Sequence, residues 1–325
     1  MLTISILAGA LALAAPNDVL VVVNKDASTV SVISLATGAT LVTLPTGTGP
    51  HEAAASGDGR LAVVTNYGAQ QGGNSLTVVD LGSLTVARTV DLGEYRRPHG
   101  IVFLPDNRRV AVTSETSGMV LVVDVTTGRI VSARPTAQEG SHMVVAARDG
   151  RRAFTANIRS GSVTALDLDS GDPRSLLVST QTEAIGVSPD GAQVWVGSND
   201  QGTVTVVRTG EWRVIDTLHV GGQPYRIVFS PDGSRVLVTT PASDEVRLFD
   251  AATRRELGRL KTPASSGSAG QPFGVAWNPD GRLGYITLRG AAQVAVVDIE
   301  KMALLRHLTA GPGADGIAFA RRPAP

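Results

Sequence analysis

Short apolar segments alternate with polar turns along almost the whole chain. Between residues 100 and 133, four such segments occupy 100–103, 110–114, 119–123 and 129–133, and turns containing Asp, Asn and Gly separate them. Segments rich in Val, Ile and Thr, with turn residues every eight to twelve positions, are typical of β-strands. The pattern therefore predicts an all-β protein.

This unit of four strands is repeated at a regular distance. The first strand of each unit begins at a marker position, and in six of seven units an Asp follows the marker by seven residues, inside a turn. Neighbouring markers are 41 to 48 residues apart, and four-stranded units of this period are typical of β-propeller blades. The marker residues, in chain order, are His51, His99, His142, Glu183, Tyr225, Phe273 and Asp315.

The two ends of the chain complete one another. Segments 19–23, 30–34 and 40–44 supply three strands without an inner strand, and segment 315–319 supplies an inner strand without followers. Pairing them hides two sheet edges that would otherwise be exposed. We therefore expect a seven-bladed β-propeller with four antiparallel strands per blade, in which the N- and C-terminal strands close the last blade.

The first residues resemble an export signal. Residues 1–15 are largely apolar and end in small residues, although the segment before the apolar run contains no Lys or Arg. We interpret 1–15 as a signal peptide and 16–325 as a single propeller domain, which predicts a periplasmic or secreted protein. No membrane span is expected after processing.

Composition narrows the range of partners. The chain contains 29 basic and 29 acidic residues, and aromatic residues make up 4%. A neutral chain gains little from counterion release, so nucleic acid is not an expected partner. There are no cysteines, which excludes thiolate metal ligands and a cysteine nucleophile.

Several repeats resemble a known family. The sequences Ala-Val-Val-Thr-Asn at 62–66, Pro-His-Gly-Ile at 98–101 and Ser-Pro-Asp-Gly at 230–233 are similar to the YVTN-type β-propeller repeat. The resemblance implies the propeller fold. It does not imply one activity, because the family contains surface-layer, periplasmic and dehydrogenase-subunit propellers. Some repeats depart from the motif: Ser114-Glu115 and Thr239-Thr240 replace the Thr-Asn pair.

Four consecutive markers carry metal-binding side chains. Because His51, His99, His142 and Glu183 are equivalent positions in adjacent blades, we expect them to lie at one mouth of the central channel. Imidazole and carboxylate are ligands for divalent Fe, Cu, Zn, Mn or Ni. Glu183 is predicted to be either the fourth ligand or a catalytic base. The alternative is that the histidines only form hydrogen bonds to neighbouring blades.

Longer loops are expected on the same face as these markers, at 67–74, 94–97 and 262–271. Such loops commonly carry function on a rigid scaffold. The residues expected to bind a small-molecule substrate are Tyr67, Tyr95, Arg96, Arg97, Tyr225 and Phe273. The aromatic residues among them are expected opposite the histidines, and the arginines would attract an anion.

Two classes of function follow from the sequence. The first is a metal-dependent enzyme that acts on a small molecule, with the reaction type left open. The second is a non-catalytic exported propeller that binds a protein, a glycan or a metal on the histidine face. A lactonase-like hydrolase is a third hypothesis.

Overall fold

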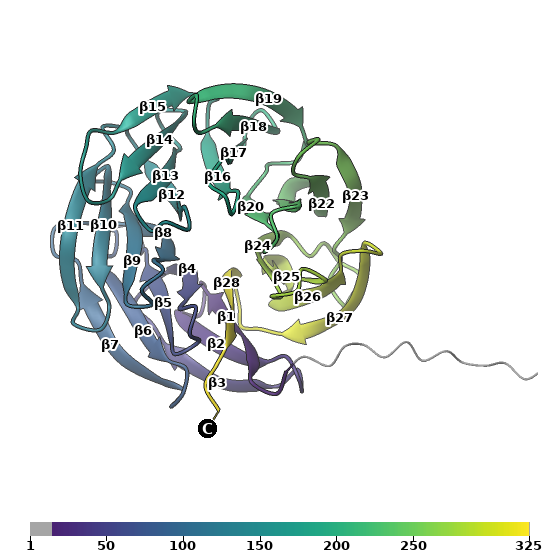
Figure 1. The fold of residues 1–325 in the computed structure, drawn as a ribbon. Coiled ribbons are helices and arrows are strands. Elements are labelled where there is room, and N and C mark those ends of the chain that lie inside the picture. Colours follow the sequence, from purple (N-terminus) through teal and green to yellow (C-terminus); the bar gives the residue numbers. More distant parts are fainter. Residues whose placement is uncertain (1–14, 325) are drawn as a thin grey trace, which may run out of the picture.

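Seven four-stranded antiparallel sheets form a closed ring around a central channel (Figure 1). The structure is a computed structural model and describes residues 15–324. We number the blades from the one that contains the N-terminal strands, and we give the strands of each blade from the channel outward. Blades 1 to 3 consist of β28 (Ala314–Arg321), β1 (Asp18–Asn24), β2 (Thr29–Ser34) and β3 (Thr40–Pro45); β4 (Pro50–Ala55), β5 (Leu61–Asn66), β6 (Ser75–Asp80) and β7 (Thr85–Asp91); β8 (Pro98–Phe103), β9 (Arg109–Ser114), β10 (Met119–Asp124) and β11 (Arg129–Pro135).

The other four blades repeat this order, and two single-turn 3-10 helices, η1 and η2, precede the third strands of blades 6 and 7. Blades 4 to 7 consist of β12 (Ser141–Ala146), β13 (Arg152–Asn157), β14 (Ser162–Asp167) and β15 (Arg174–Leu177); β16 (Thr182–Val187), β17 (Gln193–Ser198), β18 (Thr203–Arg208) and β19 (Arg213–His219); β20 (Arg226–Phe229), β21 (Arg235–Thr240), η1 (Pro241–Ser243), β22 (Glu245–Asp250) and β23 (Glu256–Lys261); β24 (Pro272–Trp277), β25 (Leu283–Leu288), η2 (Arg289–Ala291), β26 (Gln293–Asp298) and β27 (Ala303–Thr309).

The hydrophobic pattern of each strand reflects its distance from the channel. All seven residues of β1 are buried, because this strand packs against neighbouring blades on both faces of its sheet. The outermost strand β3 shows only exposed and partly buried positions, with one face toward solvent. The core thus consists of apolar layers between adjacent blades, including one between blades 2 and 3 and another between blades 4 and 5.

The chain ends close the ring as expected. Strand β28 pairs antiparallel with β1, with Val19 opposite Ala320 and Val21 opposite Ala318. An ion pair between Arg321 Nε and Asp18 Oδ1, 2.7 Å apart, fastens the end of this ladder. The predicted seven-bladed architecture, including the composite blade, is confirmed.

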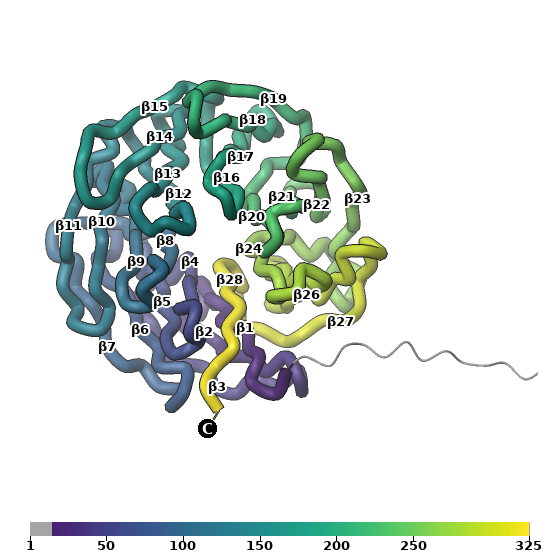
Figure 2. Tube along the Cα trace, in the orientation of Figure 1, coloured from purple at the N-terminus to yellow at the C-terminus, as the bar shows by residue number. Residues whose placement is uncertain are grey.

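The ring has two different faces. The innermost strands begin at the face that carries the markers, which we call the histidine face, and end at the Asp-containing turns, on the turn face. Loops 67–74, 94–97 and 262–271 all lie on the histidine face, because they precede an inner strand or join the second strand to the third. Figure 2, in which the C-terminal segment crosses in front of β1 to β3, looks onto the turn face.

The predicted signal peptide lies, except for Ala15, outside the described residues, and export stays a prediction. Within residues 15–324, no helix has the length and apolar character required to cross a bilayer.

Candidate metal centre at the channel mouth

Threonines of the second strands fix the backbone of the markers. The Thr65 hydroxyl donates to the carbonyl of His99 at 3.0 Å, and the Thr113 hydroxyl donates to the carbonyl of His142 at 2.7 Å. Each bond runs from one blade to the inner strand of the next blade. The repeated threonine therefore holds consecutive markers at one level around the channel.

The residue after the marker is Gly in blades 1, 3 and 7, where inner strands approach closely. A Cβ atom on Gly100 would lie 2.5 Å from the backbone nitrogen of Val144, and one on Gly316 would lie 2.5 Å from the carbonyl oxygen of His51. Real Cβ contacts are not that short, so only glycine permits this spacing at these places. The close spacing brings neighbouring imidazoles together.

The three predicted histidine ligands form a stack. The ring centroids of His51 and His99 are 4.0 Å apart, and those of His99 and His142 are 3.6 Å apart. His99, in the middle, is fully buried, and neither of its ring nitrogens has a hydrogen-bond partner among the described residues. A buried polar atom without a partner is costly, which makes His99 a candidate ligand position.

His142, at one end of the stack, lies between two carboxylates. Its Nδ1 lies 3.0 Å from Glu115 Oε2, and its Nε2 lies 3.5 Å from Glu183 Oε1. Burial alone would lower the pKa of His142, but the hydrogen bonds and negative charges of Glu115 and Glu183 raise this pKa to about 9. Without a metal, His142 is therefore an imidazolium at neutral pH.

The other two imidazoles are neutral. Burial, together with the positive charges of Lys25 and neighbouring groups, holds the pKa values of His51 and His99 well below the usual histidine value. The Nδ1 atom of His51 also lies 3.4 Å from Glu52 Oε1 and 3.5 Å from Asp315 Oδ2. Neutral imidazoles are the form that binds metal ions.

The potential ligands assemble as two overlapping groups rather than one. The first consists of His51, Glu52 and His99, the second of His99, Glu115 and His142, and within each group the ligand atoms lie within 4.8 Å of one another. The predicted ligand Glu183 belongs to neither group and faces the second through His142. Its 3.5 Å separation from His142 Nε2 is close to that of two ligands of one tetrahedral ion with bonds of about 2.1 Å.

A basic cluster occupies the other half of the mouth. Lys25 Nζ and Arg289 Nη1 lie 3.7 and 4.0 Å from Asp315 Oδ2. Arg226 forms a buried ion pair with Glu52, and its Nη1 lies 3.8 Å from Glu183 Oε1. Burial raises the pKa of Asp315, although the surrounding cations oppose that rise. The mouth thus combines imidazoles on one side with paired cations on the other.

The aromatic residues are placed differently from the prediction. Tyr67 was expected opposite the histidines but lies beside them, with ring centroids 5.6 Å from His51 and 5.2 Å from His99. Its hydroxyl donates to Glu115 Oε2 at 3.1 Å. The ring centroids of Tyr225 and Phe273 are 4.2 Å apart, so these two residues form an aromatic pair. They occupy the marker positions of the two blades that follow the blade of Glu183.

Of the remaining predicted substrate-binding residues, only one reaches the site. The guanidinium of Arg97 lies 4.8 Å from the Tyr67 ring centroid. Arg96 is exposed and its Nη1 donates to the carbonyl of Gly72 at 3.3 Å, in the neighbouring loop. Tyr95 packs against the apolar layer between blades 2 and 3, so it supports the scaffold and does not join the mouth.

Several charged members of the mouth were not among the residues predicted from the sequence. Glu115 immediately follows the second strand of blade 3. Because Pro50 pairs with Asn66 and Pro98 with Ser114, the equivalent of the Thr-Asn pair is Thr113-Ser114. The expected replacement by Ser114-Glu115 was therefore one residue out of register, and no departure from the repeat indicated Glu115. Glu52 and Arg226 directly follow marker residues, but adjacency in a strand does not reveal which side chains meet. Lys25 comes from the turn after β1, and no repeat position predicted it.

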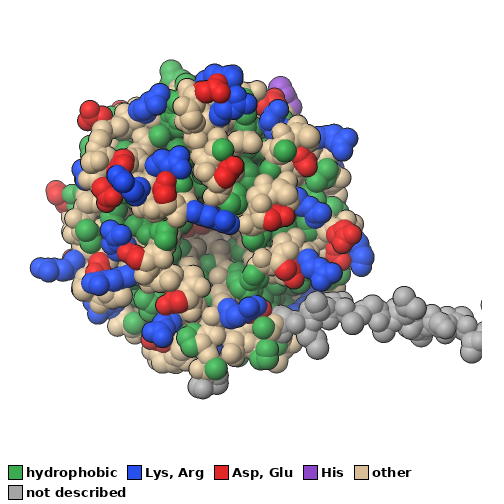
Figure 3. Space-filling view, viewed as in Figure 1, with side chains coloured by type: hydrophobic (Ala, Val, Ile, Leu, Met, Phe, Trp, Pro, Cys, Tyr) green, Lys and Arg blue, Asp and Glu red, His purple; other side chains and the backbone are tan. Residues whose placement is uncertain are grey.

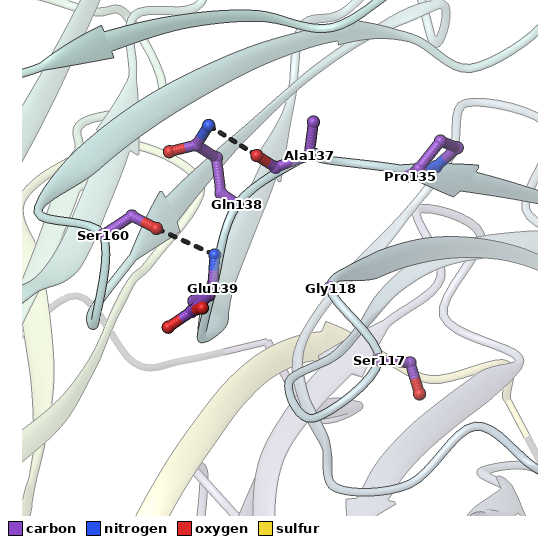
Figure 4. A pocket seen from close by; sticks show the side chains of 7 residues that line it. All are labelled: Ser117, Gly118, Pro135, Ala137, Gln138, Glu139 and Ser160. Atoms are coloured by element: carbon purple, nitrogen blue, oxygen red, sulfur yellow. Dashed lines mark hydrogen bonds between the residues drawn. The ribbon is translucent and has the colours of Figure 1, made fainter.

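A separate polar hollow lies farther out on the histidine face, between blades 3 and 4 (Figure 4). Its volume is about 480 Å³, and its wall includes Gln138, Glu139 and Ser160. The Glu139 amide donates to Ser160 Oγ at 2.8 Å, and Gln138 Nε2 donates to the carbonyl of Ala137 at 2.7 Å. Glu139 is the one acid among the lining residues, and no histidine joins it, so this hollow lacks a group of metal-binding side chains.

Comparison with known proteins identifies the class. The chain belongs to the lactonase, 7-bladed β-propeller family, which matches residues 10–277. No curated protein sequence shows significant similarity to this chain. The resemblance of the repeats to the YVTN type stays a prediction.

Solved structures agree with the fold. One similar structure is hydrazine synthase of Kuenenia stuttgartiensis, with a TM-score of 0.72 and 20% identity over 82% of this chain and 88% of that chain. Another is a functionally unknown protein of Desulfotomaculum acetoxidans DSM 771, with a TM-score of 0.77 and 16% identity over 94% of this chain and 99% of that chain. At these identities the similarity shows the fold alone.

Proposed function

We propose that the chain is a metal-dependent hydrolase that opens a small cyclic ester at the mouth of the channel. In this proposal His51, His99, His142 and Glu183 surround one divalent transition metal ion, with Glu183 as ligand or general base. Membership in the lactonase family favours hydrolysis over redox chemistry. Fold similarity by itself does not define an activity, so the proposal depends on the site.

The observation that carries the proposal is the state of His99. Its two ring nitrogens are fully buried, have no hydrogen-bond partner among the described residues, and lie between two further imidazoles. A purely structural histidine in this position would be expected to form a hydrogen bond to the protein. A metal ion would satisfy a nitrogen that is otherwise left unpaired.

The carboxylates around His142 are also placed as expected for a histidine that binds a metal ion. Metal-bound histidines commonly donate their second ring N–H to a carboxylate, which fixes the ring and increases its basicity. Glu115 stands in that position at Nδ1 of His142, so Nε2 is left to face the ion and Glu183. Because the metal-free pKa of His142 is about 9, binding at neutral pH would release the Nε2 proton.

Lactone hydrolysis would use these groups in a balanced sequence. A metal ion supplies polarisation of the carbonyl and a more acidic bound water. The water oxygen would bond to the carbonyl carbon while Glu183 takes one of the water protons, and the ring C–O bond would then break. The ring oxygen would take that proton from Glu183, which gives a hydroxy acid, and the new carboxyl group would lose its own proton to solvent at neutral pH. The new carboxylate would form beside the cations of the mouth, including Lys25 and Arg226.

Metal analysis is the first test. The chelator-treated protein would be reloaded with Fe(II), Cu(II), Zn, Mn(II) or Ni(II), dialysed and analysed by mass spectrometry, with His219→Ala as control because His219 is exposed on β19. We expect one ion per chain in the wild type and in the control, and a loss of at least tenfold in His99→Ala. Full metal content in the double variant His51→Ala, His99→Ala would reject the site.

Activity is tested separately. Proton release from a panel of five- and six-membered lactones would be followed with and without metal, and Glu183→Gln should lose more activity than metal if Glu183 acts as the base. Stoichiometric metal without turnover of any lactone would keep the metal site and reject the hydrolase. Neither metal nor turnover would favour the non-catalytic binding propeller.

A further inference from the structure

Beneath the polar mouth, the central channel contains an apolar cavity that opens toward the turn face. The cavity, which we call the lumen, has a volume of about 340 Å³, and residues of the turns, such as Pro189 and Pro231, contribute to its open end. The space-filling view shows a hollow in the middle of the ring with hydrophobic side chains around it (Figure 3). Six inner strands contribute aliphatic or thioether side chains, among them Ile101, Met143, Ile185, Val228, Val275 and Ile317.

A buried ion pair separates the lumen from the mouth. Glu52 and Arg226 line the inner end of the lumen and contact each other, and they are only 7% and 5% exposed. Arg226 is also near Glu183, so two carboxylates already balance its charge. The inner end therefore offers little net attraction for a further anion.

The open end carries an available cation. Arg148, just beyond the end of β12, is exposed and lines the lumen, and its Nη2 donates to the carbonyl of Pro231 at 2.8 Å. That bond uses one of five guanidinium N–H groups. Within residues 15–324, Arg148 forms no ion pair with a carboxylate. Its remaining donors are free to pair with an anion at the rim.

The walls favour an aliphatic occupant over water. An apolar cavity offers few hydrogen-bond partners, so water gains little there, and apolar ligands enter such cavities readily. The volume of about 340 Å³ equals roughly ten water molecules, and a methylene group occupies roughly the same space as one water. A chain of roughly eight to twelve carbons therefore fits the lumen.

We propose that the lumen is a second ligand site, which binds a medium-chain fatty carboxylate. The alkyl chain lies among the aliphatic side chains, and the carboxylate stays at the turn face, paired with Arg148. This assignment does not depend on the metal site, because the Glu52–Arg226 pair lies between the two.

The test uses hexanoate, octanoate and decanoate, with binding measured by calorimetry on the full chain. Affinity should rise about fourfold per added methylene until the lumen is full, the ratio that corresponds to about 0.8 kcal/mol for each buried CH₂. Val228→Phe and Val187→Phe place larger side chains at partly buried lining positions and should each weaken decanoate at least tenfold. Val131→Phe, at an exposed position on β11, is the matched control and should bind normally.

A separate comparison tests whether Arg148 pairs with the carboxylate head group. Arg148→Ala should weaken the binding of decanoate about threefold to fivefold at low salt, which is the range of an exposed ion pair. The same variant should bind decan-1-ol with unchanged affinity, because the alcohol carries no charge. His99→Ala should leave decanoate binding intact. Affinity that is independent of chain length, or decanoate binding that survives both lumen-filling substitutions in folded protein, would overturn the proposal.

Discussion

His142 Nδ1 lies 3.0 Å from Glu115 Oε2, although the two residues come from different blades. Together with Glu183, Glu115 converts a buried imidazole, which burial would keep neutral, into an imidazolium with a pKa of about 9. The Glu115 contact also orients the ring so that its other nitrogen faces Glu183. One contact thus fixes the direction of a potential metal ligand and contributes to its charge.

Glu115→Gln should change how the stability of the metal-free protein depends on pH. Because the folded-state pKa of His142 is raised, its contribution is fully present below about pH 6.5 and is lost as pH rises toward 9. The shift corresponds to about 3 kcal/mol at most. We expect the variant to lose less stability than the wild type between pH 6.5 and 9, measured by urea unfolding in chelator.

The control for this experiment is Glu211→Gln, which alters an exposed carboxylate on the outside of blade 5. It should show the wild-type pH profile. A Glu115→Gln profile with the same alkaline loss as the wild type would contradict the assigned ion pair.

His51 and His99 should have the opposite effect, a loss of folding stability as the pH falls. Their folded-state pKa values are depressed, so the unfolded chain binds more protons below about pH 6.5 and the folded state loses stability as pH falls. Each histidine contributes at most about 1.4 kcal/mol per pH unit to the slope of the unfolding free energy. His99→Gln should flatten the slope of unfolding free energy between pH 6.5 and 5, whatever its effect on absolute stability. An unchanged slope would show that His99 is already accessible to protons.

Gly100→Ala tests the close approach of inner strands. The added Cβ would lie 2.5 Å from a backbone nitrogen of β12, so the blades must shift, and we expect a loss of roughly 1–3 kcal/mol in unfolding free energy. Gly210→Ala is the matched control, because no atom lies within 4 Å of its added Cβ. Metal binding by the folded Gly100→Ala variant should also weaken, since His99 precedes the shifted residue. Equal stability of the two variants would show that the spacing is not restrictive.

The sequence was sufficient to predict the scaffold because the information is local and repeated. Alternating apolar residues define each strand, and the constant offset between marker and turn Asp aligns the blades without ambiguity. The orphan strands at the two ends then leave one way to close the ring. The prediction that equivalent markers share one level follows from the same alignment, and the threonine bonds between blades explain it physically.

The partners of the markers were not predictable in the same way. Glu115 meets His142 only because one blade packs its second strand against the first strand of the next, at a distance that no sequence period encodes. Tyr67 was placed on the wrong side because its loop folds inward over His51 and His99. Side chains on irregular loops depend on tertiary contacts, whereas strand positions depend on the repeat.

The buried pair of Glu52 and Arg226 gives the last prediction. Both side chains are almost fully buried, and removal of one leaves an uncompensated charge in a medium of low dielectric constant. Glu52→Ala should therefore lower the unfolding free energy by about 3–5 kcal/mol. The double variant Glu52→Leu, Arg226→Leu should recover much of that loss, because it removes both charges and fills the space.

The exposed pair of Arg208 and Glu211 provides the comparison. Its nitrogen and oxygen are 2.8 Å apart, yet both side chains are about half exposed, so Glu211→Ala should cost no more than about 1 kcal/mol. Chemical unfolding at one pH of the wild type, the single variants Glu52→Leu and Arg226→Leu and the double variant gives the coupling energy between Glu52 and Arg226. If Glu52→Ala cost as little as Glu211→Ala, water would reach Arg226, and the barrier between mouth and lumen would not exist.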